Sequence, residues 1–159
     1  MLGPLKDLLH HQAWADATFF WAWGASGALE DVDLRTRTDH MVSTQEAFLQ
    51  VLKGDVVVHP DHPLPAFQVL KARCEASHQV LRALGRGLDE ASLSRTVRVP
   101  WFPDPPCVIS VSDVLLQLCL HTQHHRGQNM ARLKALGALA KNVDYIIWLW
   151  KQKPEARWG

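Results

Sequence analysis

One stretch near the end of the chain, residues 113–136, constrains the fold more than any other. It carries three of the nine histidines of the chain within five residues. Its apolar residues recur at helical spacing and form a wide apolar surface, which consists of Leu115, Leu118, Leu120, Met130, Leu133 and Leu136. The stretch is therefore predicted to be one long core helix with histidines at the edge of its apolar face.

The spacing of these histidines indicates a metal site. His121 and His125 are four residues apart, so on a helix their side chains lie on one face with Cβ atoms about 5–6 Å apart, close enough to share an ion. His124, three residues after His121, offers an alternative pair. A solvated polar face is the simpler explanation. A catalytic zinc usually has three protein ligands, so a third would have to come from elsewhere in the chain.

Three motifs together resemble one known family. The string HTQHHRGQ (residues 121–128) resembles the His-x-x-x-His-Arg-Gly-Gln signature of the DinB/YfiT-like metal-binding four-helix bundles, which are unrelated to the DNA polymerase of similar name. Trp14-Ala15-Asp16 and TDHMVSTQEAFLQVLKG (residues 38–54) resemble the first two helices of that family, and residues 95–111 resemble its hairpin. One departure is Gln117, where many members carry a further histidine; this difference bears on the substrate.

The resemblance implies a ligand set. The two outer histidines of the motif correspond to His121 and His125, and the third family ligand corresponds to His40. The HRGQ tail of the motif favours His125 over His124. Three neutral imidazoles would leave open positions on a divalent ion, and zinc and nickel both suit such ligands.

Residues beside the predicted ligands are candidates for a pocket. Thr44 and Gln117 lie one helical turn from a ligand, and Asp16 could support an imidazole through a hydrogen bond. No catalytic base can be named from the sequence. Arg126 could bind a substrate anion or form an ion pair that fixes the bundle.

The resemblance supports three roles for such a site. The protein could be a transferase or isomerase that uses a low-molecular-weight thiol, or it could be a metal-dependent hydrolase, and both would act on a small-molecule substrate. The third role is a non-catalytic metal-binding protein of the stress response. A purely structural bundle with satisfied histidines is the alternative from a different class.

The remaining segments predict an all-α fold, an antiparallel four-helix bundle with a small β-hairpin insertion and a short C-terminal helix, in one domain over residues 1–159. The first three helices are expected at residues 4–24, about 38–53 and 65–84, the second capped by Thr36-Arg-Thr-Asp39. Residues 94–111 alternate as a hairpin does. A short helix that starts near Asn142 or Asp144 is apolar on nearly all sides and is expected to be buried.

Charge and cysteine content narrow the function class. The net charge is +1, so no basic patch for nucleic acid or an anionic membrane is predicted. The three cysteines, Cys74, Cys107 and Cys119, show no pairing pattern, and no apolar run is long enough for a membrane span. We therefore expect a cytoplasmic protein, and the family resemblance adds a homodimer.

Two smaller expectations complete the sequence analysis. Gly127 lies within the predicted long helix, where glycine is unfavourable, so it is expected to permit close approach of another backbone. His59 and His62 could suggest a second metal site, but their flanking prolines favour a loop.

Overall fold

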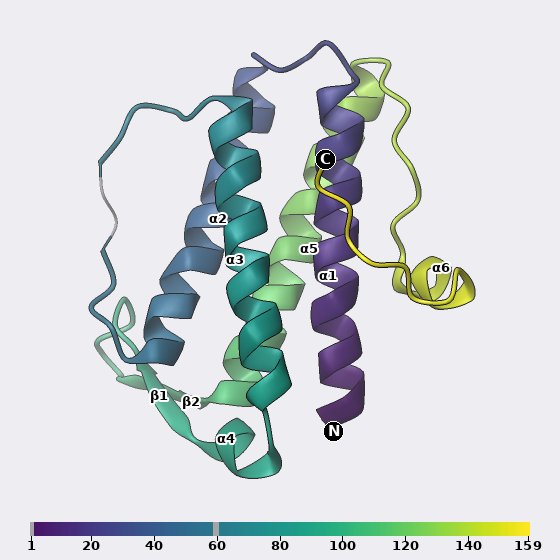
Figure 1. Ribbon diagram of the computed structural model, residues 1–159. Helices are drawn as coiled ribbons and strands as arrows, with labels where there is room; N and C mark the ends of the chain where they lie inside the picture. Colours follow the sequence, from purple (N-terminus) through teal and green to yellow (C-terminus); the bar gives the residue numbers. More distant parts are fainter. Residues whose placement is uncertain (1, 59–60) are drawn as a thin grey trace.

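Figure 1 shows a computed structural model of the chain, which describes residues 2–58 and 61–159. Four long helices form a bundle, and a small two-stranded sheet lies at one end of it. In chain order the elements are α1 (Leu2–Gly24), α2 (Val32–Lys53), α3 (Phe67–Gly87), α4 (Glu90–Ser94), β1 (Thr96–Val99), β2 (Cys107–Ser110), α5 (Val111–Ala135) and α6 (Tyr145–Trp150). The predicted all-α bundle with a hairpin insertion is confirmed.

The four long helices pack in a ring in which each contacts two neighbours. α1 contacts α3 and α5, and α2 contacts the same two helices. In Figure 1, α1 and α5 run in one direction, and α2 and α3 run in the other. The α1–α3 and α2–α5 contacts are therefore antiparallel, and the predicted metal ligands lie on the antiparallel pair α2 and α5.

The N-terminus of α2 lies earlier than predicted. Asp31, not the Thr36 segment, caps the helix, because its carboxylate accepts a hydrogen bond of 2.9 Å from the backbone amide of Leu34. Arg132 of α5 holds the same carboxylate at 2.8 Å. His40 consequently lies well inside α2 and not in its first turn, which corrects the sequence prediction. The predicted C-terminal stop is confirmed, since Gly54 adopts a left-handed φ of 80°.

A layer of buried polar side chains divides the core into two apolar parts. The part next to the hairpin contains Phe48, Leu81 and Leu115, and the other part contains Phe19 and Leu133. The polar layer consists of Gln12, Asp16, Gln45, His78, Thr122 and Arg126. Because buried polar groups are costly unless they are bonded, this layer has to be satisfied internally.

The hairpin and the start of α5 follow the predicted pattern. β1 and β2 pair antiparallel with Val97 opposite Ile109 and Val99 opposite Cys107. Ser110 ends β2 and caps α5, and its side chain forms a capping box with Asp113. The short helix α4 was not predicted; its signal is a second capping box between Asp89 and Ser92.

Three expectations about packing are wrong. Only Trp148 of α6 is buried, whereas Ile146 and Trp150 are 67% and 73% exposed, because one face of this short helix covers α1 and the rest meets solvent. Leu120 of α5 and Leu136, which directly follows this helix, are also exposed. No described atom outside its own helix backbone lies within 4 Å of a Cβ placed on Gly127, so no close approach explains that glycine.

In the part of the chain that the structure describes, no helix combines the length and the apolar character that a membrane crossing needs.

Candidate metal centre

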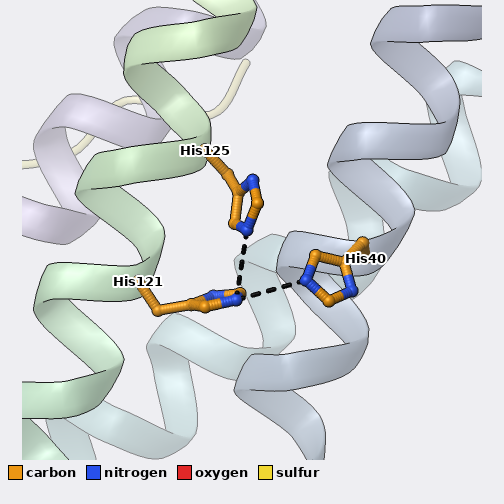
Figure 2. Close-up of side chains that lie close together, drawn as sticks. All are labelled: His40, His121 and His125. Carbon is orange, nitrogen blue, oxygen red and sulfur yellow. Dashed lines mark hydrogen bonds between the residues drawn. The ribbon is translucent and has the colours of Figure 1, made fainter.

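Two facing helices bring the three predicted ligands together. His121 and His125 lie one turn apart on α5, and His40 projects toward them from α2 (Figure 2). The antiparallel contact between these helices is what joins residues that are far apart in sequence. His40 is exposed, while His121 and His125 are half-buried. These three residues are called the three-histidine cluster below.

The ring nitrogens of the cluster converge on one point. The Nε2 atom of His121 lies 3.2 Å from Nε2 of His40 and 3.2 Å from Nε2 of His125. One nitrogen from each of the three residues lies within 4.8 Å of the others. Three imidazole nitrogens at this separation form a donor set that suits one divalent ion.

The protonation of the cluster also suits a cation. Partial burial and the neighbouring histidines lower the pKa of His121 to about 4, and burial likewise lowers the pKa of His125. Both rings are therefore neutral near pH 7. A neutral imidazole offers a lone pair, which is the form that binds a metal.

A side chain that the sequence analysis missed fixes one of these rings. Nδ1 of His125 donates to Oε1 of Gln128 at 2.9 Å, which leaves the lone pair of His125 on Nε2, facing His121. The amide of Gln128 donates in turn to His124 at 3.1 Å. His124 is exposed and does not belong to the cluster, although its ring lies 5.0 Å from the ring of His125 between centroids. The sequence did offer a signal for this role, because Gln128 is the last residue of the HRGQ string.

The second ring on α5 has no such support. Nδ1 of His121 is buried and has no hydrogen-bond partner among the described residues. Packing alone therefore orients this ring. Of the two predicted ligands on α5, His125 is the one that has, among the described residues, the outer hydrogen bond that metal-bound imidazoles usually make.

A cavity of about 670 Å³ opens beside the cluster, between α2, α5 and the hairpin. His40 and His121 line one part of it, and Thr44 and Gln117, both predicted from the sequence, also line it. The hydroxyl of Thr44 donates to the backbone oxygen of His40 at 2.8 Å. The aromatic residues from the hairpin that complete the wall were not predicted.

Asp16, the remaining predicted pocket residue, does not line this cavity. It is fully buried in the polar layer, where Arg126 and His78 hold its two oxygens at 2.6 and 2.7 Å. Burial would raise the pKa of Asp16, but these partners more than offset it, so the pKa lies below its ordinary value. Of the two roles weighed for Arg126, the ion pair within the bundle is the one observed.

Asp16, Cys74 and His78 form a second group whose donor atoms lie within 4.8 Å of one another. We call it the buried Asp16 cluster. Its charge is already balanced, because Arg126 pairs with Asp16. Burial, and then the charge of Asp16, raise the pKa of Cys74 well above its ordinary value, so the sulfur stays a protonated thiol. A metal would have to displace this proton and bind beside the charge of Arg126, so the group is a poorer metal site than the three-histidine cluster.

His62 lies in a loop, as its flanking prolines predicted, and the described residues form no metal-ligand group around it. His59 lies outside the residues that the structure describes. His62 is exposed, and its Nδ1 lies 3.1 Å from the backbone oxygen of Pro63. Its Nε2 lies 4.0 Å from Asp39, in a partly exposed contact.

Comparison with known proteins agrees with the geometry. A family model described as the DinB superfamily matches residues 34–129, which include all three histidines of the cluster. Neither the curated proteins nor the solved structures gave a significant match.

Proposed function

The chain belongs to the DinB superfamily, and from this premise we propose that it is a metal-dependent enzyme whose divalent ion is bound by His40, His121 and His125. The observation that carries the proposal is the convergence of the three ring nitrogens beside a cavity of small-molecule size. The lowered pKa of His121 supports the proposal, because protons then compete less with a metal for the lone pair of this ring.

Zinc or nickel is the proposed ion, since both bind imidazole well. When bound with open positions, such an ion lowers the pKa of a coordinated water or thiol and so supplies a nucleophile near neutral pH. The protein contributes a fixed His125 ring through Gln128 and a cavity that holds the second reactant next to His121. Thr44 and Gln117 offer hydrogen bonds to that reactant.

The lining of the cavity ranks the two reaction classes. Hydrolysis commonly adds a carboxylate as general base. Asp113 is the acidic residue among the described residues that line the cavity, and its carboxylate accepts hydrogen bonds from the hydroxyl and the backbone amide of Ser110 at 2.5 and 3.1 Å. A carboxylate committed to a helix cap is poorly placed to move protons. Transfer or isomerisation with a low-molecular-weight thiol therefore ranks first, and hydrolysis second.

The competing proposal is a protein without catalysis, either a metal-binding protein of the stress response or a purely structural bundle. The two enzyme classes and this alternative predict different results in one assay. Zinc-loaded and nickel-loaded protein would be incubated with a panel of uncharged electrophiles, with and without a low-molecular-weight thiol, and with ester and amide substrates. His121→Ala is the test variant, and His124→Ala is the matched control on the same helix.

The expected result is metal-dependent and thiol-dependent turnover that His121→Ala abolishes and His124→Ala retains. Turnover of esters or amides without thiol would move the assignment to hydrolysis. Metal binding without turnover across the panel would favour the non-catalytic protein. Turnover that is equal in both variants would contradict the proposed site.

Three wider expectations belong to the same proposal. We propose a single domain, a cytoplasmic location and a homodimer. The three free cysteines support the reducing compartment. The exposed Ile146 and Trp150 of α6 support an apolar contact between copies.

A further inference from the structure

The cavity beside the three-histidine cluster has an apolar wall that the hairpin supplies. Val99 and Cys107 are paired across the two strands, so their side chains lie on the same face of the sheet. Together with Ile109 on that face, they line the cavity. Val108 alternates to the opposite face and is 56% exposed. One face of the hairpin is therefore built as cavity wall.

Aromatic rings form the rest of the apolar part. Phe48 of α2 is buried, and its ring packs edge-on against Trp101 at 5.0 Å between centroids. Phe102 follows at 6.3 Å from Trp101, lines the same cavity and is 56% exposed. Rings in such tilted arrangements offer faces and edges to a flat apolar group.

Asp113 supplies the carboxylate among the described side chains that line the cavity. No lysine or arginine is found among the described residues that line it. Asp113 is the acidic side chain, and its hydrogen bonds with Ser110 lower its pKa, so it stays negative at neutral pH. Asp113 lies eight residues before His121 on α5, about 12 Å along the helix axis. A negative group in the apolar part would find no cation there and would meet Asp113.

The polar residues lie between these two ends. Gln117 is one turn from His121 and one turn from Asp113 on the same face of α5, and Thr44 is one turn from His40 on α2. Thr44 donates its proton to the backbone of α2, so it can only accept from a ligand. Gln117 can both donate and accept. The lining of the cavity therefore consists of metal ligands at one end, hydrogen-bonding side chains in the middle and aromatic rings at the other end.

We propose that this cavity selects an uncharged molecule with a polar, metal-binding head and a flat apolar tail, and that the tail lies between Phe48, Trp101 and Phe102. This inference rests on the proposed function, because the head is placed by the ion at the three-histidine cluster. A tail that carries a carboxylate is rejected.

Hydroxamates test this, because one chelating head can carry different tails. Calorimetric titration of zinc-loaded protein would compare acetohydroxamate, benzohydroxamate and 4-carboxybenzohydroxamate. Burial of the phenyl ring should make benzohydroxamate bind about tenfold more tightly than acetohydroxamate. The added carboxylate should remove this gain, about tenfold or more.

Matched variants locate the tail. Phe102→Ala should reduce the preference for benzohydroxamate over acetohydroxamate by about threefold or more and leave acetohydroxamate binding unchanged. Val108→Ala, which removes an equally exposed side chain from the outer face of the same hairpin, should change neither affinity. Zinc content would be measured for each protein.

The outcomes separate this inference from the proposed function. If zinc binds and the three hydroxamates show equal affinities, or the carboxylate binds best, the substrate class is wrong while the metal site stands. If the preference survives Phe102→Ala, the tail lies elsewhere and the inference is overturned. If no zinc binds, the proposed function fails, and the inference falls with it.

Discussion

The three-histidine cluster and the buried Asp16 cluster are linked through α5, whose Arg126 pairs with Asp16, yet only one of them has the character of a metal site. Thr122 and Arg126, which belong to the polar layer, directly follow His121 and His125 in sequence. Both clusters meet the same distance criterion. The three-histidine cluster is open and lies beside a cavity, whereas the buried Asp16 cluster is enclosed and already pairs with the cation of Arg126.

This difference teaches that donor spacing alone does not define a metal site. The three converging ring nitrogens of the first cluster can bind a cation, because no other positive group is bonded to them among the described residues. A carboxylate that is bonded to a guanidinium has no such need, and a second cation beside Arg126 would be repelled in a medium of low dielectric. We therefore propose that the first cluster binds a metal and that the second stabilises the fold.

The largest effect is expected from breaking the buried Asp16 cluster. Asp16→Ala leaves the Arg126 charge uncompensated in the core, which should lower the free energy of unfolding by about 3–5 kcal/mol. Urea unfolding in the presence of chelator measures it. The double variant Asp16→Ala, Arg126→Met should recover much of the loss. Equal losses in the double and single variants would contradict the ion-pair assignment.

The next largest effect is stabilisation by zinc, which should depend on the three-histidine cluster and not on the buried Asp16 cluster. An ion that binds only the folded protein stabilises it by about 2.7 kcal/mol when the free ion is present at 100 times its dissociation constant. Thermal unfolding should show this gain with zinc, and excess chelator should remove it. His40→Ala should lose the gain, whereas Asp16→Ala should keep it. A zinc response in His40→Ala equal to that of wild type would refute the assignment.

A smaller effect is expected where one ligand is oriented by its neighbour. Gln128→Ala frees the His125 ring, and loss of such an outer hydrogen bond typically weakens metal affinity about 10–100-fold. Competition with a coloured chelator measures the affinity. Gln79→Ala is the control, because Gln79 is exposed and its side chain bonds Glu75 on its own helix, away from the three-histidine cluster. An unchanged affinity in Gln128→Ala would show that packing alone fixes His125.

The smallest effect is a difference in pH dependence of the metal-free protein. The pKa of His121 is about 4 in the folded protein and 6.5 ordinarily, so the unfolded chain binds the extra proton first. The contribution of His121 to the free energy of unfolding is therefore fully present above pH 6.5 and is lost as the pH falls toward 4. The pKa of Asp16 is lowered from 3.8, so its contribution is lost only below that value. Unfolding of wild type and His121→Ala between pH 7 and 4 should show the difference; parallel curves would contradict it.

Local spacing was enough to predict part of this site. The helical repeat of α5 placed His121 and His125 on one face, and the capping box at Ser110 fixed where that helix begins. His40 could not be found by spacing, because its partners lie on another helix; the family resemblance supplied it. Gln128 was missed, although it is three residues from His125 and within reach on the same helix.

Long-range contacts explain the features that sequence reasoning missed. The start of α2 depends on Asp31, whose carboxylate is held by Arg132 from the far end of α5. The buried Asp16 cluster draws Asp16, Cys74 and His78 from helices α1 and α3, and no local pattern joins them. The exposure of α6 likewise depends on how much of it the bundle can cover.

Metal content per chain, measured by elemental analysis after loading with zinc and gel filtration, tests the central claim most directly. The proteins compared would be wild type, His40→Ala, His121→Ala and His125→Ala, with His78→Gln in the buried Asp16 cluster and His124→Ala as controls. We expect about one ion per chain in wild type and both controls, and almost none in the three ligand variants. Loss of the ion in His78→Gln, with retention in His121→Ala, would contradict the account.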